Sequence, residues 1–294
     1  MLVLGINLPE ATQRWASLQQ AVAGALPGQE LVRVPAVDVR GRAVGDPALP
    51  LTPLARWRMM RRSARMCSTP LLDTLSAVGC SLSHLECWRR LLAAAAAGGA
   101  RFALVLEDDC CLPMPAFGAA WRAAVAPLLR DDPPSFDVLV LGHHPNHRLW
   151  NFTDRNAPGG DPGSPWLRHH WFYGSHCYVV SAPGARRLTE LALPLELHID
   201  CFLAHAINLG LVRGLVLRRS VAPQCLHRRE QGIVHFAPHN DNFKREVPDV
   251  SVAFALVVVA VLAAVVLAVC AAARAWRTRA ARPSWEEKDA RHDA

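Results

Sequence analysis

Three consecutive carboxylates give the clearest chemical signal in this chain. Glu107, Asp108 and Asp109 directly follow four apolar residues, 103–106, which read as a buried strand. Adjacent like charges at the rim of a core lose hydration and raise one another's pKa, so we expect a positive partner beside them. Because side chains alternate along a strand, Glu107 and Asp109 are predicted to share one face and Asp108 to point to the other.

A divalent cation is the partner that this chemistry favours. Mg²⁺ and Mn²⁺ prefer oxygen ligands, commonly one or two carboxylates together with water and substrate phosphates. The carboxyl edge of a parallel sheet is also where α/β proteins bind ligands. We therefore predict that Glu107 and Asp109 bind a metal ion and a diphosphate leaving group. A solvated acidic loop is the alternative, since short acidic runs are common at strand ends.

Alternating strands and helices are predicted to position these carboxylates. The spacing of strand, helix and strand favours an α/β domain with a mainly parallel sheet over residues 1–225. The segment 143–168, rich in Pro, Gly, Asn and His, is predicted to be a loop beside the site. The expected strands are 2–8, 31–39, 103–107, 136–142, 177–181 and 212–219, and the expected helices are 11–25, 81–97, 116–129, 183–191 and 200–209.

Composition restricts the kinds of molecule that the chain is expected to bind. A chain of 294 residues that is 51% hydrophobic can bury a sizeable core. The net charge of +7 comes mostly from arginine and suits phosphate or carboxylate groups, and without a nucleic-acid motif no nucleic-acid partner is expected. Five arginines within 56–65 either bind an anionic substrate or membrane, or form a solvated helix face. Nine cysteines without a CxxC pair are interpreted as buried thiols in a reducing compartment.

A membrane anchor is predicted near the end of the chain. Residues Val250–Ala273 carry no charge and are long enough for a single transmembrane helix, between a linker at 226–249 and a basic and polar tail at 274–294. Four arginines close behind the span, at 274, 277, 279 and 282, favour a cytoplasmic tail and a main domain on the other side. The start of the chain nevertheless shows no signal peptide, so we expect a cytosolic domain, with a lumenal one left open. A glycan on the sequon at Asn151 would require the lumenal side.

Several motifs resemble one enzyme family. GCSLSHLECWRRLL (79–92), followed closely by ALVLEDD, resembles glycosyltransferase family 25, which contains bacterial lipooligosaccharide galactosyltransferases and collagen galactosyltransferases. The resemblance continues in order over 2–224, in INLPEATQR, VPAVD, FDVLVLG, GSHCYVVSAPGARRL and LHIDCFL. It implies a GT-A-like single domain with a mixed, mainly parallel sheet. It also implies a metal-dependent, inverting transfer of a hexose, galactose or glucose, from a nucleoside-diphosphate sugar such as a UDP-sugar to a hydroxyl of a glycan, lipid-linked or protein acceptor.

The resemblance also assigns residues. It implies that Glu107 and Asp109 bind Mn²⁺ or Mg²⁺ with the diphosphate, and that Asp108 bonds near the ribose or the sugar. The opening motif and the GCSLSH motif would lie beside the nucleotide sugar through Ile6, Asn7, Arg14, Ser83 and His84. His227 or His235 would complete the metal shell.

Inversion also needs a base that takes the acceptor proton opposite the leaving group. Asp200 is the first choice and His176 the second. The alternatives are a helix N-cap for Asp200 and a strand histidine bonded to backbone for His176. The sequence leaves both pairs of readings open.

Other functions remain to be separated from sugar transfer. A catalytically inactive relative that binds ligands at a membrane is the main alternative. A nucleotide-sugar phosphatase or pyrophosphorylase would also use carboxylates and a metal, but no glycine-rich phosphate motif supports it. Cys110 and Cys111 stand where the family has an aliphatic residue and are interpreted as packing. The segment 143–168 looks like an insertion, which leaves the acceptor open.

Overall fold

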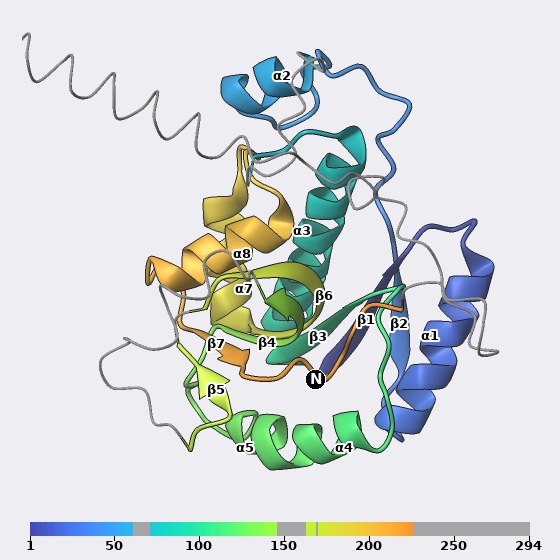
Figure 1. Ribbon diagram of the computed structural model, residues 1–294, viewed down its shortest axis with the longest axis vertical. Coiled ribbons are helices and arrows are strands. Elements are labelled where there is room, and N and C mark those ends of the chain that lie inside the picture. Colours follow the sequence, from blue (N-terminus) through green and yellow to red (C-terminus); the bar gives the residue numbers. More distant parts are fainter. Residues whose placement is uncertain (61–70, 146–162, 169, 226–294) are drawn as a thin grey trace, which may run out of the picture. The chain divides into compact units, whose positions relative to one another are not determined.

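A seven-stranded mixed sheet forms the centre of the domain (Figure 1) in the computed structural model, which describes residues 1–60, 71–145, 163–168 and 170–225. The strands, in the order β2-β1-β3-β6-β4-β7-β5, are β1 (Leu2–Asn7), β2 (Leu31–Pro35), β3 (Phe102–Glu107), β4 (Val138–Pro145), β5 (Trp166–Leu167), β6 (Phe172–Ser181) and β7 (Gly214–Leu217). β1 pairs in parallel with β2 and β3, and β4 with β7, whereas β6 and β5 run against their neighbours. The predicted mixed, mainly parallel α/β sheet is therefore confirmed.

Helices cover both faces of this sheet (Figure 1). The apolar side chains of β3 alternate between the two cores, since Val105 packs with α3, α7 and α8, and Leu104 packs with α1 and α4. Burial on both faces explains the uninterrupted apolar run before the carboxylates. The helices are α1 (Thr12–Ala25), α2 (Pro53–Met60), α3 (Leu75–Ala96), α4 (Ala116–Ala120), α5 (Ala126–Leu128), α7 (Ala182–Ala192) and α8 (Ile199–Asn208), and a π-helical turn, Trp121–Val125, joins α4 to α5.

Some predicted boundaries are wrong. Helix α3 begins at Leu75, six residues before the predicted start at 81, because the side chain of Thr74 accepts a hydrogen bond from the Ala77 N–H and caps the helix there. β2 ends at Pro35 rather than at 39. β4 continues to Pro145 and β5 forms at Trp166–Leu167, so the predicted loop 143–168 begins and ends inside the sheet.

A disulfide corrects the interpretation of the cysteines. Cys111 is bonded to Cys225, with the two Cα atoms 5.5 Å apart. Cys110 is a buried free thiol, as the packing interpretation expects, but Cys111 is not. Sequence spacing alone gave no indication of this pair, because its members are 114 residues apart and the fold brings them together.

Several predictions fall outside the described residues. These are the transmembrane span Val250–Ala273 with its linker and tail, the sequon at Asn151, three of the five clustered arginines, and His227 and His235. Within the part of the chain that the structure describes, no helix is long and apolar enough to cross a membrane.

Candidate functional site

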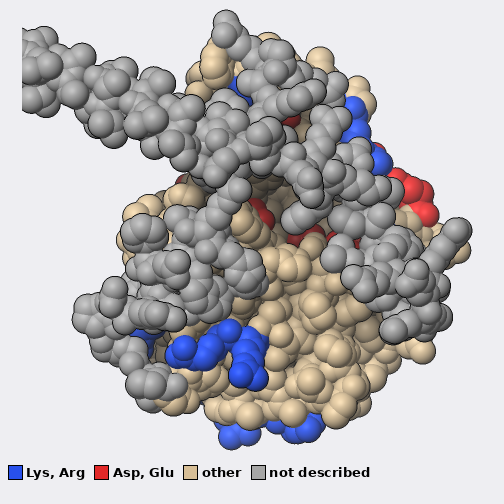
Figure 2. All heavy atoms as spheres, viewed as in Figure 1, with Lys and Arg blue, Asp and Glu red and all other residues tan. Residues whose placement is uncertain are grey.

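A cleft of about 230 Å³ lies at the carboxyl ends of β1 and β3, against the first turns of α3. Glu107, Asp108 and Asp109 all line it. Figure 2 shows acidic atoms in a hollow near the middle of the face in view. The structure thus places the predicted carboxylates at a concave sheet edge, where α/β folds bind ligands.

The chain turns at the end of β3, which corrects the predicted alternation of faces. β3 ends at Glu107, and the Cys110 N–H donates to the Glu107 carbonyl at 3.0 Å. Strand alternation therefore stops after Glu107, and Asp108 lines the same cleft as its two neighbours instead of pointing away.

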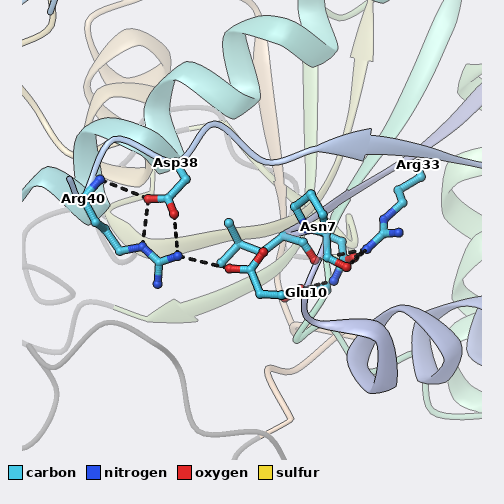
Figure 3. Close-up of polar contacts among 8 residues, drawn as sticks. Asn7, Glu10, Arg33, Asp38 and Arg40 are labelled. Atoms are coloured by element: carbon cyan, nitrogen blue, oxygen red, sulfur yellow. Dashed lines mark hydrogen bonds and ion pairs between the residues drawn. The ribbon is translucent and has the colours of Figure 1, made fainter. Parts of the chain in front are cut away.

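Asp108 is held by two residues of the predicted opening motif. Arg14 Nη1 lies 2.9 Å from Asp108 Oδ1, and Asn7 Nδ2 donates to Asp108 Oδ2 at 2.5 Å. Arg33 in turn donates to the side-chain oxygen of Asn7 (Figure 3). Asn7 and Arg14 line the cleft, where they bind a carboxylate of the chain, and their place beside a nucleotide stays a prediction.

A second charged group lies on the rim of the cleft. Arg40 donates to Asp38 at 2.6 Å and 2.8 Å and to Glu10 at 3.1 Å (Figure 3). The Arg40 hydrogen bonds hold the pKa of Asp38 down at about 2. Both residues are exposed, so this rim offers charge to an incoming ligand.

Glu107 contacts a set of buried polar side chains that are hydrogen-bonded to one another. Ser175 Oγ donates to Glu107 Oε1 at 2.8 Å, and His84 Nε2 lies 3.4 Å from the same oxygen. His84 Nδ1 is 2.9 Å from the Tyr178 hydroxyl, which also accepts from Trp88 Nε1. Burial alone would raise the pKa of Glu107, but the contact with His84 outweighs it and the pKa is lowered. His84 is fully buried and does not line the cleft, so it reaches a ligand only through Glu107.

Asp109 is the carboxylate whose charge is least compensated. Only 7% of the residue is exposed; Oδ2 accepts from Gln224 at 3.2 Å, whereas Oδ1 has no hydrogen-bond partner. Burial, with Glu107 and Asp108 beside it, raises the pKa of Asp109 to about 8. The demand for a positive ligand inferred from the sequence is therefore concentrated on this residue.

The GCSLSH motif explains how α3 approaches the cleft. A Cβ added at Gly79 would lie 2.4 Å from the Val37 carbonyl oxygen, so only glycine fits there. Ser83 Oγ accepts from the Val37 N–H at 2.8 Å and donates to the Gly79 carbonyl at 2.7 Å. These contacts fix the segment after β2 as one wall of the cleft, and Ser83 lines that wall.

The opposite wall contains Asp200 but not His176. The Gly174 N–H donates to Asp200 Oδ2 and the Cys201 N–H to Asp200 Oδ1, at 2.8 Å and 2.7 Å. Asp200 lies in the first turn of α8, whose N-cap is His198. His176 is fully buried behind the cleft with Nε2 2.7 Å from the Ala222 carbonyl oxygen, and burial lowers its pKa to about 4. Of the two predicted bases, only Asp200 lines the cleft.

Other residues of the site were not singled out from the sequence. His144 and Gln224 line the cleft, with His144 Nε2 2.9 Å from Gln224 Oε1. His198 also lines it, with Nε2 3.2 Å from Asp73 Oδ1. A usable signal existed for His198, which is two residues before the predicted base in HIDCF, but none for Asp73 and Gln224, which only the fold brings near.

A second donor set shares Glu107. Single donor atoms of Cys80, His84 and Glu107 lie within 4.8 Å of one another, the one such group among the residues that the structure describes. Thiolate, imidazole and carboxylate together are typical ligands of Zn²⁺ rather than of Mg²⁺. The predicted oxygen set of Glu107 and Asp109 overlaps this group only at Glu107.

Comparisons with known proteins do not assign the chain to a family. No protein-family profile and no curated protein matches it. Among solved structures it is similar to A197 from STIV, with a TM-score of 0.34 and 10% identity over 76% of this chain and 83% of that one. It is also similar to an active-site mutant of LgtC, with a TM-score of 0.29 and 10% identity over 70% of each chain. Similarity at this level carries no functional argument, so the resemblance to family 25 remains a sequence-based prediction.

Proposed function

We propose that this protein is a glycosyltransferase that moves a hexose from a nucleoside-diphosphate sugar to a hydroxyl of a glycan, lipid-linked or protein acceptor. The observation that carries the proposal is the partly buried carboxylate cluster at the sheet edge, in which the buried Asp109 keeps an unpaired oxygen in a cleft. Such a cluster needs a cation, and a cation beside an open cleft suits a diphosphate. The family 25 resemblance adds the sugar and the inverting course of the transfer.

The residues present fit the implied Mn²⁺ or Mg²⁺. Asp109 Oδ1 is buried without a hydrogen-bond partner, and Glu107 is ionised with its pKa lowered. Glu107 and Asp109 would hold the cation, which supplies charge compensation for the diphosphate when bound. Loss of the Asp109 proton would accompany binding, because a carboxyl with a pKa of about 8 must ionise to act as a ligand.

The chain's own residues prepare the rest of the site. Arg14 and Asn7 fix Asp108 at the floor, where it is positioned to accept hydrogen bonds from ribose or sugar hydroxyls. Ser83 and the Val37 backbone form the wall proposed to lie along the nucleotide. The rim group of Asp38 and Arg40 provides one carboxylate and one guanidinium at the entrance. Val250–Ala273 is proposed to anchor this domain to a membrane.

The test uses the full chain, purified in detergent, with a panel of UDP- and other nucleotide sugars and Mn²⁺ or Mg²⁺. We expect one donor to bind in a metal-dependent way and to be hydrolysed slowly without acceptor. Asp109→Asn should abolish metal-dependent donor binding, and Asp46→Asn, at a carboxylate paired with Arg42 away from the cleft, should not. Binding without hydrolysis or transfer would favour the inactive binding module, and no binding of any donor would overturn the proposal.

A further inference from the structure

We infer that His198, oriented by Asp73, is the catalytic base that accepts the proton of the acceptor hydroxyl. The inference rests on the proposed function and gives that site a residue that neither the sequence motifs nor the family resemblance assigned. It depends on three observations: how the pair is built, which nitrogen of His198 remains for a substrate, and why Asp200 is less suited.

Two short strand-like contacts hold the segment that carries His198. Leu195 pairs with Leu51, and its N–H donates to the Pro50 carbonyl at 2.6 Å. Leu197 pairs with Leu71, and the Leu72 N–H donates to the Glu196 carbonyl at 2.8 Å. The second contact places Asp73 alongside His198, at the start of α3. The backbone therefore aligns the two side chains before any ligand binds.

The pair has the form of a base and its orienting carboxylate. His198 Nε2 lies 3.2 Å from Asp73 Oδ1 in an ion-pair contact, with the side chains 19% and 27% exposed, and this oxygen has no aligned hydrogen bond within the chain. Burial would raise the pKa of Asp73, but the His198 contact outweighs it and the pKa is lowered, so a carboxylate faces the ring. A proton on Nε2 is stabilised by that carboxylate, which leaves the lone pair on Nδ1 for a substrate hydroxyl. His198 lines the cleft, as a base in contact with the substrate must.

Asp200 is less suited to the same task. Both of its oxygens already accept backbone N–H groups, from Gly174 and from Cys201. The bond from Gly174 ties β6 to the start of α8, and both bonds would be lost or weakened if the carboxylate took a proton. Asp200 is therefore assigned to positioning the wall beside His198, and its charge favours the imidazolium that forms there.

The proton transfer accompanies one bond formed and one bond broken. The acceptor O–H proton passes to His198 Nδ1 while the oxygen forms a bond to the anomeric carbon. The bond from that carbon to the diphosphate oxygen breaks, and its electron pair leaves with the nucleoside diphosphate. The imidazolium then loses its proton to water, so the products are the glycoside, the nucleoside diphosphate and one proton.

Charged groups around the pair come from three elements. Asp73 lies just before α3, Asp200 lies on α8, and Arg58 on α2 acts on Asp73 from a distance.

The experiment compares His198→Gln and Asp73→Asn with His205→Gln in the full chain. His205 lies on the same helix but does not line the cleft, and its Nδ1 contacts the Cys201 carbonyl. We expect His198→Gln to lower kcat for transfer by about 100-fold or more, and Asp73→Asn by about 10- to 100-fold. Donor Kd should change less than about threefold in both, and the loss should appear in kcat rather than in the KM for the donor.

The outcomes separate this inference from the proposed function. A wild-type protein that transfers no sugar overturns both. Transfer by the wild type together with near-normal kcat in His198→Gln overturns only the assignment of the base. Should His198→Gln lose donor binding, Asp73→Asn decides, because it retains the histidine: normal kcat with normal donor Kd in that variant would overturn the pair.

Discussion

Three adjacent carboxylates experience three different environments in this cleft. Asp108 is neutralised by Arg14, Glu107 is stabilised by His84 and Ser175, and Asp109 keeps an unpaired oxygen. The division depends on the turn after Glu107 rather than on strand alternation. The sequence therefore predicts that a cation is required, whereas the fold determines which carboxylate requires it most.

Asp109 should make the metal-free protein less stable as the pH rises. Its pKa is about 8 in the folded chain, against an ordinary value of 3.8, so the folded state retains the proton that the unfolded state releases. The contribution of Asp109 to the free energy of unfolding is fully present below about pH 4 and is lost as the pH rises through 8. In chelator at pH 8, Asp109→Asn should raise the melting temperature by several degrees.

Manganese provides the complementary measurement. Mn²⁺ should raise the melting temperature of the wild type more at pH 8 than at pH 6, because a larger fraction of Asp109 has already lost its proton at pH 8. Mn²⁺ should not stabilise Asp109→Asn. Asp46→Asn is the control, expected to behave as the wild type in both series. A lower melting temperature for Asp109→Asn than for the wild type, at pH 8 in chelator, would contradict the assigned environment.

At the scale of elements, strand β6 connects the two walls of the cleft. The Gly174 N–H donates a hydrogen bond to Asp200 on α8, and Oγ of the next residue, Ser175, donates one to Glu107 at the end of β3. The pairing of β6 with β4 shifts register on both sides of Gly142, close to these residues. Gly174 has a φ of +86°, and an added Cβ would lie 2.8 Å from His176 Nδ1.

Gly174→Ala should therefore damage both fold and site. The left-handed backbone and the close approach of His176 predict a loss of about 1–3 kcal/mol in stability and weaker donor binding. Gly24→Ala is the matched control, because Gly24 lies in α1 with no atom within 4 Å of an added Cβ and should gain about 0.5–1 kcal/mol. Thermal melting and donor titration of the two variants measure the difference. Equal melting temperatures would show that the Gly174 backbone is not under this constraint.

Elements were easier to predict than contacts. Apolar runs and 3.6-residue periodicity located β1, β3, α1 and α7 within one or two residues, since burial of a face repeats in the sequence. The early start of α3 was missed because a threonine cap precedes the apolar pattern. The pairing of Asp73 with His198 and of Cys111 with Cys225 was missed because each depends on segments far apart in the chain. Local pattern carries no information about such pairs.

At the scale of the whole molecule, the last described residues are bonded to the turn that follows β3 and carries the carboxylates. The Cys225 N–H donates to the Asp109 carbonyl at 2.7 Å, and the Cys111 N–H donates to the Pro223 carbonyl at 2.8 Å. The Cys111–Cys225 disulfide fixes this pairing covalently, and Gln224 between the two contacts binds Asp109. All described residues belong to one compact unit, which this segment closes beside the cleft.

The disulfide also bears on which side of the membrane the domain lies. Disulfides persist in oxidising compartments and are rare in the cytosol. The arginines after the predicted span favour the same orientation, with the tail in the cytoplasm and the domain opposite. The cytosolic location remains a prediction, and the disulfide favours the lumenal alternative.

Alkylation of the full chain in isolated membranes tests the location. Cys111 and Cys225 should resist a thiol reagent until a reductant is added, whereas denaturation alone should expose the buried Cys87 and Cys110. Reduction, or the double change Cys111→Ser with Cys225→Ser, should lower stability by about 2–4 kcal/mol because the bond closes a long loop, and reductant should have no further effect on the double variant.

In sealed vesicles, an added protease should digest the domain only after detergent opens the membrane. Immediate digestion in vesicles shown to be sealed with their cytoplasmic face outward, together with free thiols at both positions, would place the domain in the cytosol.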